Sequence, residues 1–121
     1  MDREQFKQRT KALALRVIRL VQGLSHNQTS GVIGGQILRS STSIGANYRA
    51  ACRAKSTADY INKLKIVEEE ADETLYWLEL LVESKIIPEA NVIDLMKEVD
   101  KIIAMTVSSI KTSRANVAIS P

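Results

Sequence analysis

The stretch RSSTSIGANYRAA, residues 39–51, decides the fold class. It is crowded with small residues, and Ser, Thr and Gly are poor helix formers. Two neighbouring rows of residues nevertheless run through it at alternating spacings of four and three, one of them being Ile33, Ile37, Ser40, Ile44, Asn47 and Ala51. That period is typical of a helix and fits no strand. We therefore predict a helix over residues 29–55, whose small inward residues let a neighbouring helix approach closely.

Three other segments carry the same period. Residues 4–24 follow Asp2, a candidate N-cap, and residues 57–85 follow Ser56, an N-cap with Asp59 three residues later. Residues 88–113 begin at Pro88, which the first turn of a helix tolerates. Their buried row is expected to be Ile93, Met96, Ile103, Val107 and Ile110, and the tail after residue 113 is expected to fray. The pattern predicts an all-α fold, an antiparallel up-down-up-down four-helix bundle, in a single domain over residues 1–121.

Composition narrows the class of protein further. The chain has 121 residues and a single cysteine, which excludes an internal disulfide and suits a reducing compartment. Its N-terminus is charged, and no run approaches the roughly 18 apolar residues of a membrane span. We expect a cytoplasmic protein with no membrane partner.

The residues of common active sites are scarce. His26 is the only histidine and lies in a predicted turn, so a metal pair held by Glu-x-x-His motifs cannot be built in the usual way. Cys52 is interpreted as a small buried hydrophobe. Gly34 and Gly35 lack the Gly-Lys-Ser/Thr ending of a phosphate loop and are expected to serve close helix packing. We expect no catalytic residue, no metal and no cofactor, and interpret the chain as not an enzyme.

Charge is distributed unevenly along the chain. Residues 1–55 carry ten Lys/Arg and two Asp/Glu, whereas residues 56–121 carry seven and twelve. This asymmetry permits an anionic partner for the first half, or neutralisation between the halves within one chain or between copies. The candidate nucleic-acid-binding residues are Arg9, Arg16, Arg19, Arg39, Arg49 and Arg53. Stacking aromatics are missing from this half apart from inward-pointing Phe6 and Tyr48, so backbone contacts to structured RNA are favoured over base reading.

A row on the predicted third helix mixes bulky apolar side chains with carboxylates away from the core row. It consists of Ile66, Glu70, Glu73, Trp77 and Leu80. An exposed patch of this kind commonly marks an interface, and Trp is enriched at binding hot spots. We interpret the row as a candidate homo-oligomer interface. The alternative is that Trp77 widens the core of the single chain.

The combination of Leu-Arg-Ser, Ser-Ile-Gly-Ala-Asn and a Ser-started helix ending in Glu-Thr-x-x-Trp-Leu-Glu-Leu spans residues 36–81. It resembles the 23S ribosomal RNA intervening-sequence proteins, compact four-helix bundles with no established enzymatic activity. The acidic residue that usually follows the Asn in that family is missing from NYRAA. The chain is also similar to the accessory variability determinant of diversity-generating retroelements, a five-membered ring with a basic surface that assists a reverse transcriptase with its RNA. The resemblance implies a homopentamer, a helix-to-helix hydrogen bond at Asn47, and an ion pair between Glu73 and an Arg of a neighbouring helix or a neighbouring subunit.

The function expected from these observations is a self-assembling bundle that presents a basic surface to structured RNA. The alternative is a protein-binding accessory factor, for example of a reverse transcriptase or other polymerase, that makes no contact with nucleic acid. A third class is a selfish passenger protein without a cellular partner.

Overall fold

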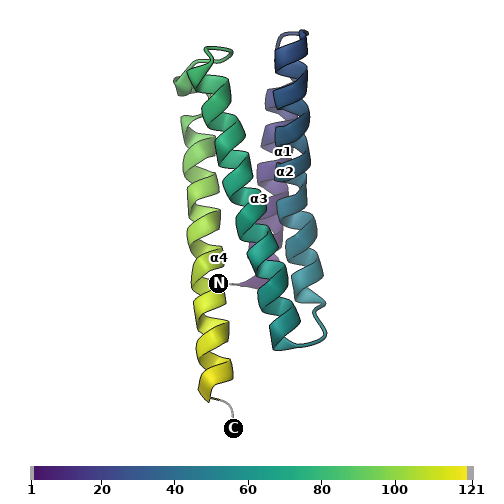
Figure 1. The fold of residues 1–121 in the computed structure, drawn as a ribbon, viewed down its shortest axis with the longest axis vertical. Helices are drawn as coiled ribbons and strands as arrows, with labels where there is room; N and C mark the ends of the chain where they lie inside the picture. The colour runs from purple at the N-terminus through teal and green to yellow at the C-terminus, as the bar shows by residue number, and fades with distance from the viewer. Residues whose placement is uncertain (1, 120–121) are drawn as a thin grey trace.

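The computed structural model describes residues 2–119, with side chains through residue 117. Its long helices are α1 (Arg3–Gln22), α2 (Gln28–Cys52), α3 (Thr57–Glu83) and α4 (Ile93–Ile119), and a 3-10 turn, η1 (Glu89–Asn91), precedes α4. The helices run alternately up and down beside one another (Figure 1). The most extensive packing is between α2 and α3, followed by α3 with α4 and α1 with α2. The packing between α1 and α4 is much less extensive. The predicted up-down four-helix bundle is confirmed. None of the described helices is long and apolar enough to cross a membrane.

Polar side chains cap the first three long helices. The Asp2 carboxylate accepts hydrogen bonds from the backbone N–H groups of Glu4, at 2.8 Å, and Gln5, at 3.3 Å. Asn27 caps α2 by accepting the N–H of the residue three positions later, and Ser56 caps α3 in the same way. Such caps satisfy N–H groups that have no partner inside the helix. The caps at Asp2 and Ser56 follow the sequence prediction.

Helix α4 departs from the prediction at both ends. Pro88 precedes η1 rather than opening the long helix, which begins at Ile93. The helix continues to Ile119, so the predicted fraying after residue 113 is wrong for residues 114–119, and residues 120 and 121 lie outside the described part. Of the predicted buried row, Ile110 is buried as expected, whereas the rest of the row is offset by one position: the other buried residues are Val92, Leu95, Val99, Ile102 and Thr106. Two adjacent apolar rows both have helical spacing here, and the sequence alone does not distinguish the one that faces α3.

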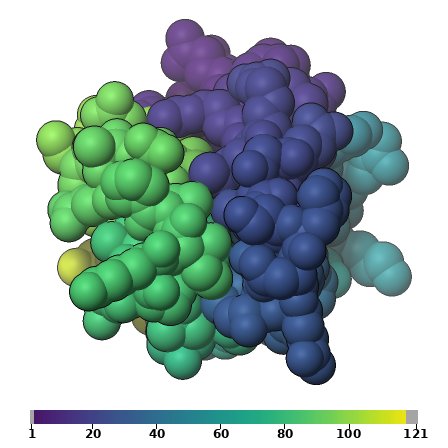
Figure 2. Space-filling view, turned by 90° about the horizontal axis from the view of Figure 1, so that it is seen from above, coloured from purple at the N-terminus to yellow at the C-terminus, as the bar shows by residue number. Residues whose placement is uncertain are grey.

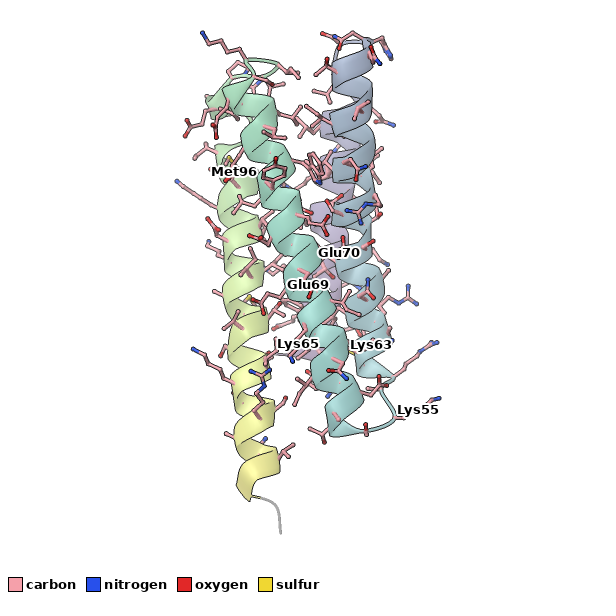
Figure 3. The ribbon with its side chains drawn as sticks, viewed as in Figure 1. Lys55, Lys63, Lys65, Glu69, Glu70 and Met96 are labelled. Carbon is pink, nitrogen blue, oxygen red and sulfur yellow. The ribbon has the colours of Figure 1, made fainter. Side chains whose placement is uncertain are left out.

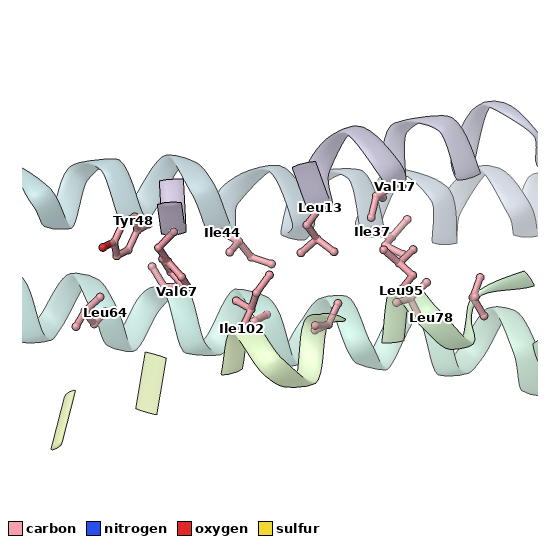
Figure 4. Close-up of a cluster of buried hydrophobic side chains, with 14 of the residues drawn as sticks. Leu13, Val17, Ile37, Ile44, Tyr48, Leu64, Val67, Leu78, Leu95 and Ile102 are labelled. Carbon is pink, nitrogen blue, oxygen red and sulfur yellow. The ribbon is translucent and has the colours of Figure 1, made fainter. Parts of the chain in front are cut away.

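The core runs along the axis of the bundle. Leu13, Ile37, Ile44, Leu64 and Leu78 are among the fully buried side chains (Figure 4). Their burial removes apolar surface from water, which is the main favourable term in folding. At the end where the α1–α2 and α3–α4 connections lie side by side (Figure 2), Leu24 and Val92 belong to the same core cluster.

Small residues on α2 bring its neighbours close. A Cβ atom built on Gly45 would lie 3.1 Å from Oγ1 of Thr10 on α1, and one built on Gly34 would lie 3.2 Å from Val21. On the other side of α2, Ser40 shares a buried 2.8 Å hydrogen bond with Thr74 of α3. The predicted close approach is therefore confirmed for these glycines. It is wrong for the adjacent Gly35, which is exposed and has no heavy atom within 4 Å of its built Cβ.

Candidate nucleic-acid interface

Two of the six candidate arginines are engaged by carboxylates of the same chain. Arg9 donates from Nε and Nη2 to the two carboxylate oxygens of Glu98 at 2.6 and 2.9 Å, which joins α1 to α4. Arg39 donates to Glu70 at 3.0 Å and to Glu73 at 2.8 Å, which joins α2 to α3. Hydrogen bonding to these carboxylates raises the pKa of both guanidinium groups. A phosphate would have to compete with these carboxylates for Arg9 or Arg39.

The other arginines of α2 lie around a hollow at the end where α2 passes into α3. We call this hollow the basic groove; it has a volume of about 790 Å³ and is lined by Arg49, Arg53, Lys55 and Lys63 together with Asp59 and small residues. Lys55 and Lys63 project from this end of the molecule (Figure 3). Among residues 2–119, none of the four cationic side chains forms an ion pair. Four cations and one carboxylate therefore give the groove a net positive charge.

The carboxylate of Asp59 contributes to the structure of the groove. Its Oδ2 accepts the backbone N–H of Lys55 at 3.2 Å, while its own N–H is donated to Ser56 Oγ at 3.1 Å. The first bond ties the connection to Asp59 and the second caps α3, so together they fix the short connection before the helix. The connection holds Lys55 beside the last turn of α2, and its ammonium group has no carboxylate partner in the part of the chain that the structure describes.

The basic surface continues from the groove towards α1. Arg49 also lines a second hollow of about 440 Å³ between α1 and α2, together with Lys7, Lys11 and Glu4. The floor of this hollow includes Thr42, Gly45 and Ala46. Small side chains on α2 thus leave room between cationic side chains, and Arg49 belongs to both hollows.

The structure does not gather all the predicted residues into one site. Arg16 is half-buried and Arg19 is exposed, and neither lines either of these two hollows. The sequence prediction missed Lys55, which lies only two residues after Arg53, because it considered arginines alone; it missed Lys63 because this residue lies on the next helix. The sequence could have indicated Lys63. Arg49 and Lys63 are equally far from Ser56, where the chain reverses direction, and two antiparallel helices bring such positions to the same level.

The row proposed as an oligomer interface is less exposed than its spacing suggests. Ile66, Glu70, Trp77 and Leu80 are half-buried, and Trp77 packs against the core cluster. The indole Nε1 of Trp77 is buried without a hydrogen-bond partner in the described chain. The adjacent Tyr76 is 54% exposed and meets Trp77 edge to face, with ring centroids 5.1 Å apart. Tyr76, which the sequence did not single out, is therefore the more exposed aromatic residue.

The two polar positions implied by the resemblance behave differently. Glu73 forms the expected interhelical ion pair, with Arg39. Asn47 does not form the expected helix-to-helix bond, because its side-chain amide donates to the carbonyl of Ser43 in the same helix, at 2.9 Å. A short amide side chain can satisfy itself on the preceding turn in this way.

Chemistry that requires a metal cluster finds no support in the geometry. Within residues 2–117, no group of three or more His, Cys, Asp and Glu side chains is placed to hold an ion. Cys52 is half-buried rather than fully buried. The features that stand out are cationic side chains around shallow hollows, which are suited to binding anions.

The fold and these side chains place the protein among helical bundles that carry a cluster of cationic side chains at one end. The profile of the 23S rRNA-intervening sequence proteins matches residues 3–108, and the chain belongs to this family. It is 42% identical to a protein of unknown function from the S23 ribosomal protein family of Bacteroides thetaiotaomicron, whose crystal structure it resembles with a TM-score of 0.82 over 88% of this chain and 98% of that one. No curated protein shows significant similarity in sequence. The resemblance to the retroelement accessory proteins stays a prediction.

Proposed function

We propose that this protein is a non-enzymatic helical bundle that binds the phosphate backbone of structured RNA through the basic groove. The observation that carries the proposal is the convergence of Arg49, Arg53, Lys55 and Lys63 around one hollow with a single carboxylate. Cationic side chains attract phosphates regardless of base sequence. The name of the family, which refers to 23S rRNA, agrees with an RNA partner.

The lining of the groove favours backbone contacts over base reading. The residues that line it include no aromatic side chain on which a base could stack. Sequence-specific recognition of single-stranded RNA generally uses such stacking, whereas double-stranded RNA is recognised by shape and by contacts to phosphate and ribose. We therefore propose an RNA hairpin or duplex as the partner.

Salt dependence tests this proposal. Fluorescence anisotropy with a labelled RNA hairpin at 50–300 mM KCl should give an affinity that falls with salt, each phosphate contact adding just under one unit to the logarithmic slope. Arg53→Gln should weaken binding and reduce that slope by about one unit. The matched control is Lys101→Gln, which removes an exposed cation from α4. A slope near zero for the unmodified protein contradicts the proposal.

The rival function is a protein-binding accessory factor, for example of a reverse transcriptase or other polymerase, whose arginines never touch nucleic acid. The intrachain pairing of Arg9 with Glu98 and of Arg39 with two carboxylates favours this reading for those residues. It predicts RNA affinity that is weak and insensitive to salt in the same titration.

Self-association is the second part of the proposal. Tyr76 is exposed, Trp77 carries an indole N–H without a partner, and aromatic residues are enriched at interfaces. We propose that copies associate through this side of α3, with the pentamer implied by the resemblance as the expected ring. Light scattering should give several times the mass of one chain. Tyr76→Arg should reduce the mass measured by light scattering. The control Leu15→Arg, at a 48% exposed apolar residue of α1, should leave that mass unchanged. If the unmodified protein is a monomer at micromolar concentration, the proposal is contradicted.

A further inference from the structure

A separate hollow lies at the end of the bundle where α4 extends beyond the start of α1 (Figure 1). We call it the end pocket; its volume is about 460 Å³. Its lining includes Arg3, the rings of Tyr48 and Tyr60, Met105 and four hydroxyl side chains of α4 within residues 108–113. It shares no lining residue with the basic groove.

The buried residue Tyr48 supplies the first sign of a ligand. Its side chain is 0% exposed, and its hydroxyl has no hydrogen-bond partner in the described chain. The oxygen points along the bundle, away from Ile44 and Ile37 and towards the end at which Leu64 lies (Figure 4). Buried polar groups nearly always have a partner, because leaving one unpaired is costly. A group that enters the pocket from outside could supply the missing partner.

The protonation of Tyr48 makes it a donor. Burial raises the pKa of its phenol well above the usual value, and the nearby thiol of Cys52 raises it further. The hydroxyl therefore keeps its proton at neutral pH. A neutral phenol that lacks a partner is suited to donating a hydrogen bond to an acceptor such as a carboxylate or phosphate oxygen.

The charge around the pocket has one sign. The guanidinium of Arg3 lies 4.9 Å from the centroid of the Tyr60 ring and pairs with no carboxylate among residues 2–119. No acidic side chain is among the described residues that line the pocket. An adjoining hollow of about 320 Å³ shares Arg3 and Tyr60 and adds a second cation, Lys55. Arginine presents paired N–H groups that match a carboxylate or phosphate.

We propose that the end pocket binds a small organic oxyanion, with Arg3 and Tyr48 holding its charged end and Tyr60 and Met105 contacting its apolar body. The Tyr48 oxygen is closed off from solvent by its neighbours. The ligand reaches it by rotation of a lining side chain. The hydroxyl groups of α4 complete the donor set around the anion.

The test uses the full chain labelled with ¹⁵N and three probes of similar size. Phenyl phosphate or benzoate should shift the amide resonances of Ser108, Ser109 and Thr112 saturably, and comparison of the two shows whether phosphate or carboxylate is preferred. Neutral benzyl alcohol should bind at least about tenfold more weakly, because it lacks the charge-assisted bonds. Absence of saturable shifts with both anions, or equal affinity for benzyl alcohol, overturns the proposal.

Variants assign the binding to the named residues. Arg3→Gln and Tyr48→Phe should each weaken the preferred anion about tenfold. Arg53→Gln, in the basic groove, should leave that affinity unchanged while weakening RNA. Far-UV circular dichroism checks that each variant folds. Because Arg3 is exposed, Arg3→Gln can still test the proposal if Tyr48→Phe fails to fold. Unchanged anion binding in a folded Arg3→Gln variant overturns the assignment. If the unmodified protein binds the anion but no RNA, only the function proposed above is contradicted.

Discussion

Two glycines of α2 provide a matched measurement of how closely α1 and α2 approach. Replacing a glycine in a helix interior by alanine stabilises the helix by about 1 kcal/mol when nothing obstructs the new methyl group. At Gly35 no heavy atom lies within 4 Å of the built Cβ, so Gly35→Ala should raise the free energy of unfolding by about that amount. At Gly45 the new methyl would lie 3.1 Å from Oγ1 and 3.5 Å from Cβ of Thr10.

Thr10 cannot easily move away from that methyl group. Its side chain is 0% exposed, and its hydroxyl lies 3.1 Å from the carbonyl oxygens of both Phe6 and Lys7. Overpacking of a buried site costs about 1–3 kcal/mol. Crowding at Gly45 should destabilise the protein by about 2 kcal/mol, and the better helix propensity of Ala should stabilise it by about 1 kcal/mol. Gly45→Ala should therefore lower the free energy of unfolding by about 1 kcal/mol. The two substitutions should thus differ by about 2 kcal/mol.

Urea denaturation followed by circular dichroism at 222 nm, at one fixed protein concentration, measures both variants. The Thr10→Ala background removes the crowded side chain, so there Gly45→Ala should become neutral or stabilising, and the double-mutant cycle isolates the contact. If Gly45→Ala instead stabilises the protein as much as Gly35→Ala, α1 and α2 are not as close as described and the reasoning fails.

Three further predictions concern buried and paired polar groups. Tyr48→Phe should leave the free energy of unfolding unchanged or raise it by about 1 kcal/mol in urea, because the lost hydroxyl has no partner; a clear loss would reveal a bond that the structure lacks. Thr74→Val should lower it by about 1 kcal/mol by removing the buried bond to Ser40, and thermal melting with an unchanged midpoint would contradict this. Glu98→Gln should lower it by about 1 kcal/mol through the weakened pair with Arg9, and the difference should shrink in 1 M NaCl.

The helical period predicted the architecture because each long helix buries one row against its neighbours. The stretch from Arg39 to Ala51 lies in the middle of α2 despite its poor helix formers, since Ile44 and Ser40 face the core and tertiary packing overrides propensity. The start of α4 was harder to predict. Both Pro88 and Ile93 are compatible with a helix start, and only packing distinguishes the two apolar rows that follow.

The candidate site was only partly predictable. Arg49 and Arg53 were identified from the charge of the first half, but Lys63 joins them only because α3 folds back along α2. Conversely, Arg39 looked available in sequence and is paired with carboxylates that come 31 and 34 residues later. Local spacing defines the faces of single helices, whereas partners across helices depend on how far each helix is shifted along its neighbour.

The most direct test of the proposed function removes the same number of positive charges from the basic groove in one variant and from α4 in another. One variant carries Gln at the four cations of the basic groove, and a control carries Gln at the exposed cations of α4, Lys97, Lys101, Lys111 and Arg114. RNA hairpin binding by fluorescence anisotropy across KCl concentrations should lose about three to four units of logarithmic salt slope in the groove variant and change little in the control. Equal losses in the two variants, or no loss in either, would contradict the groove as the RNA site.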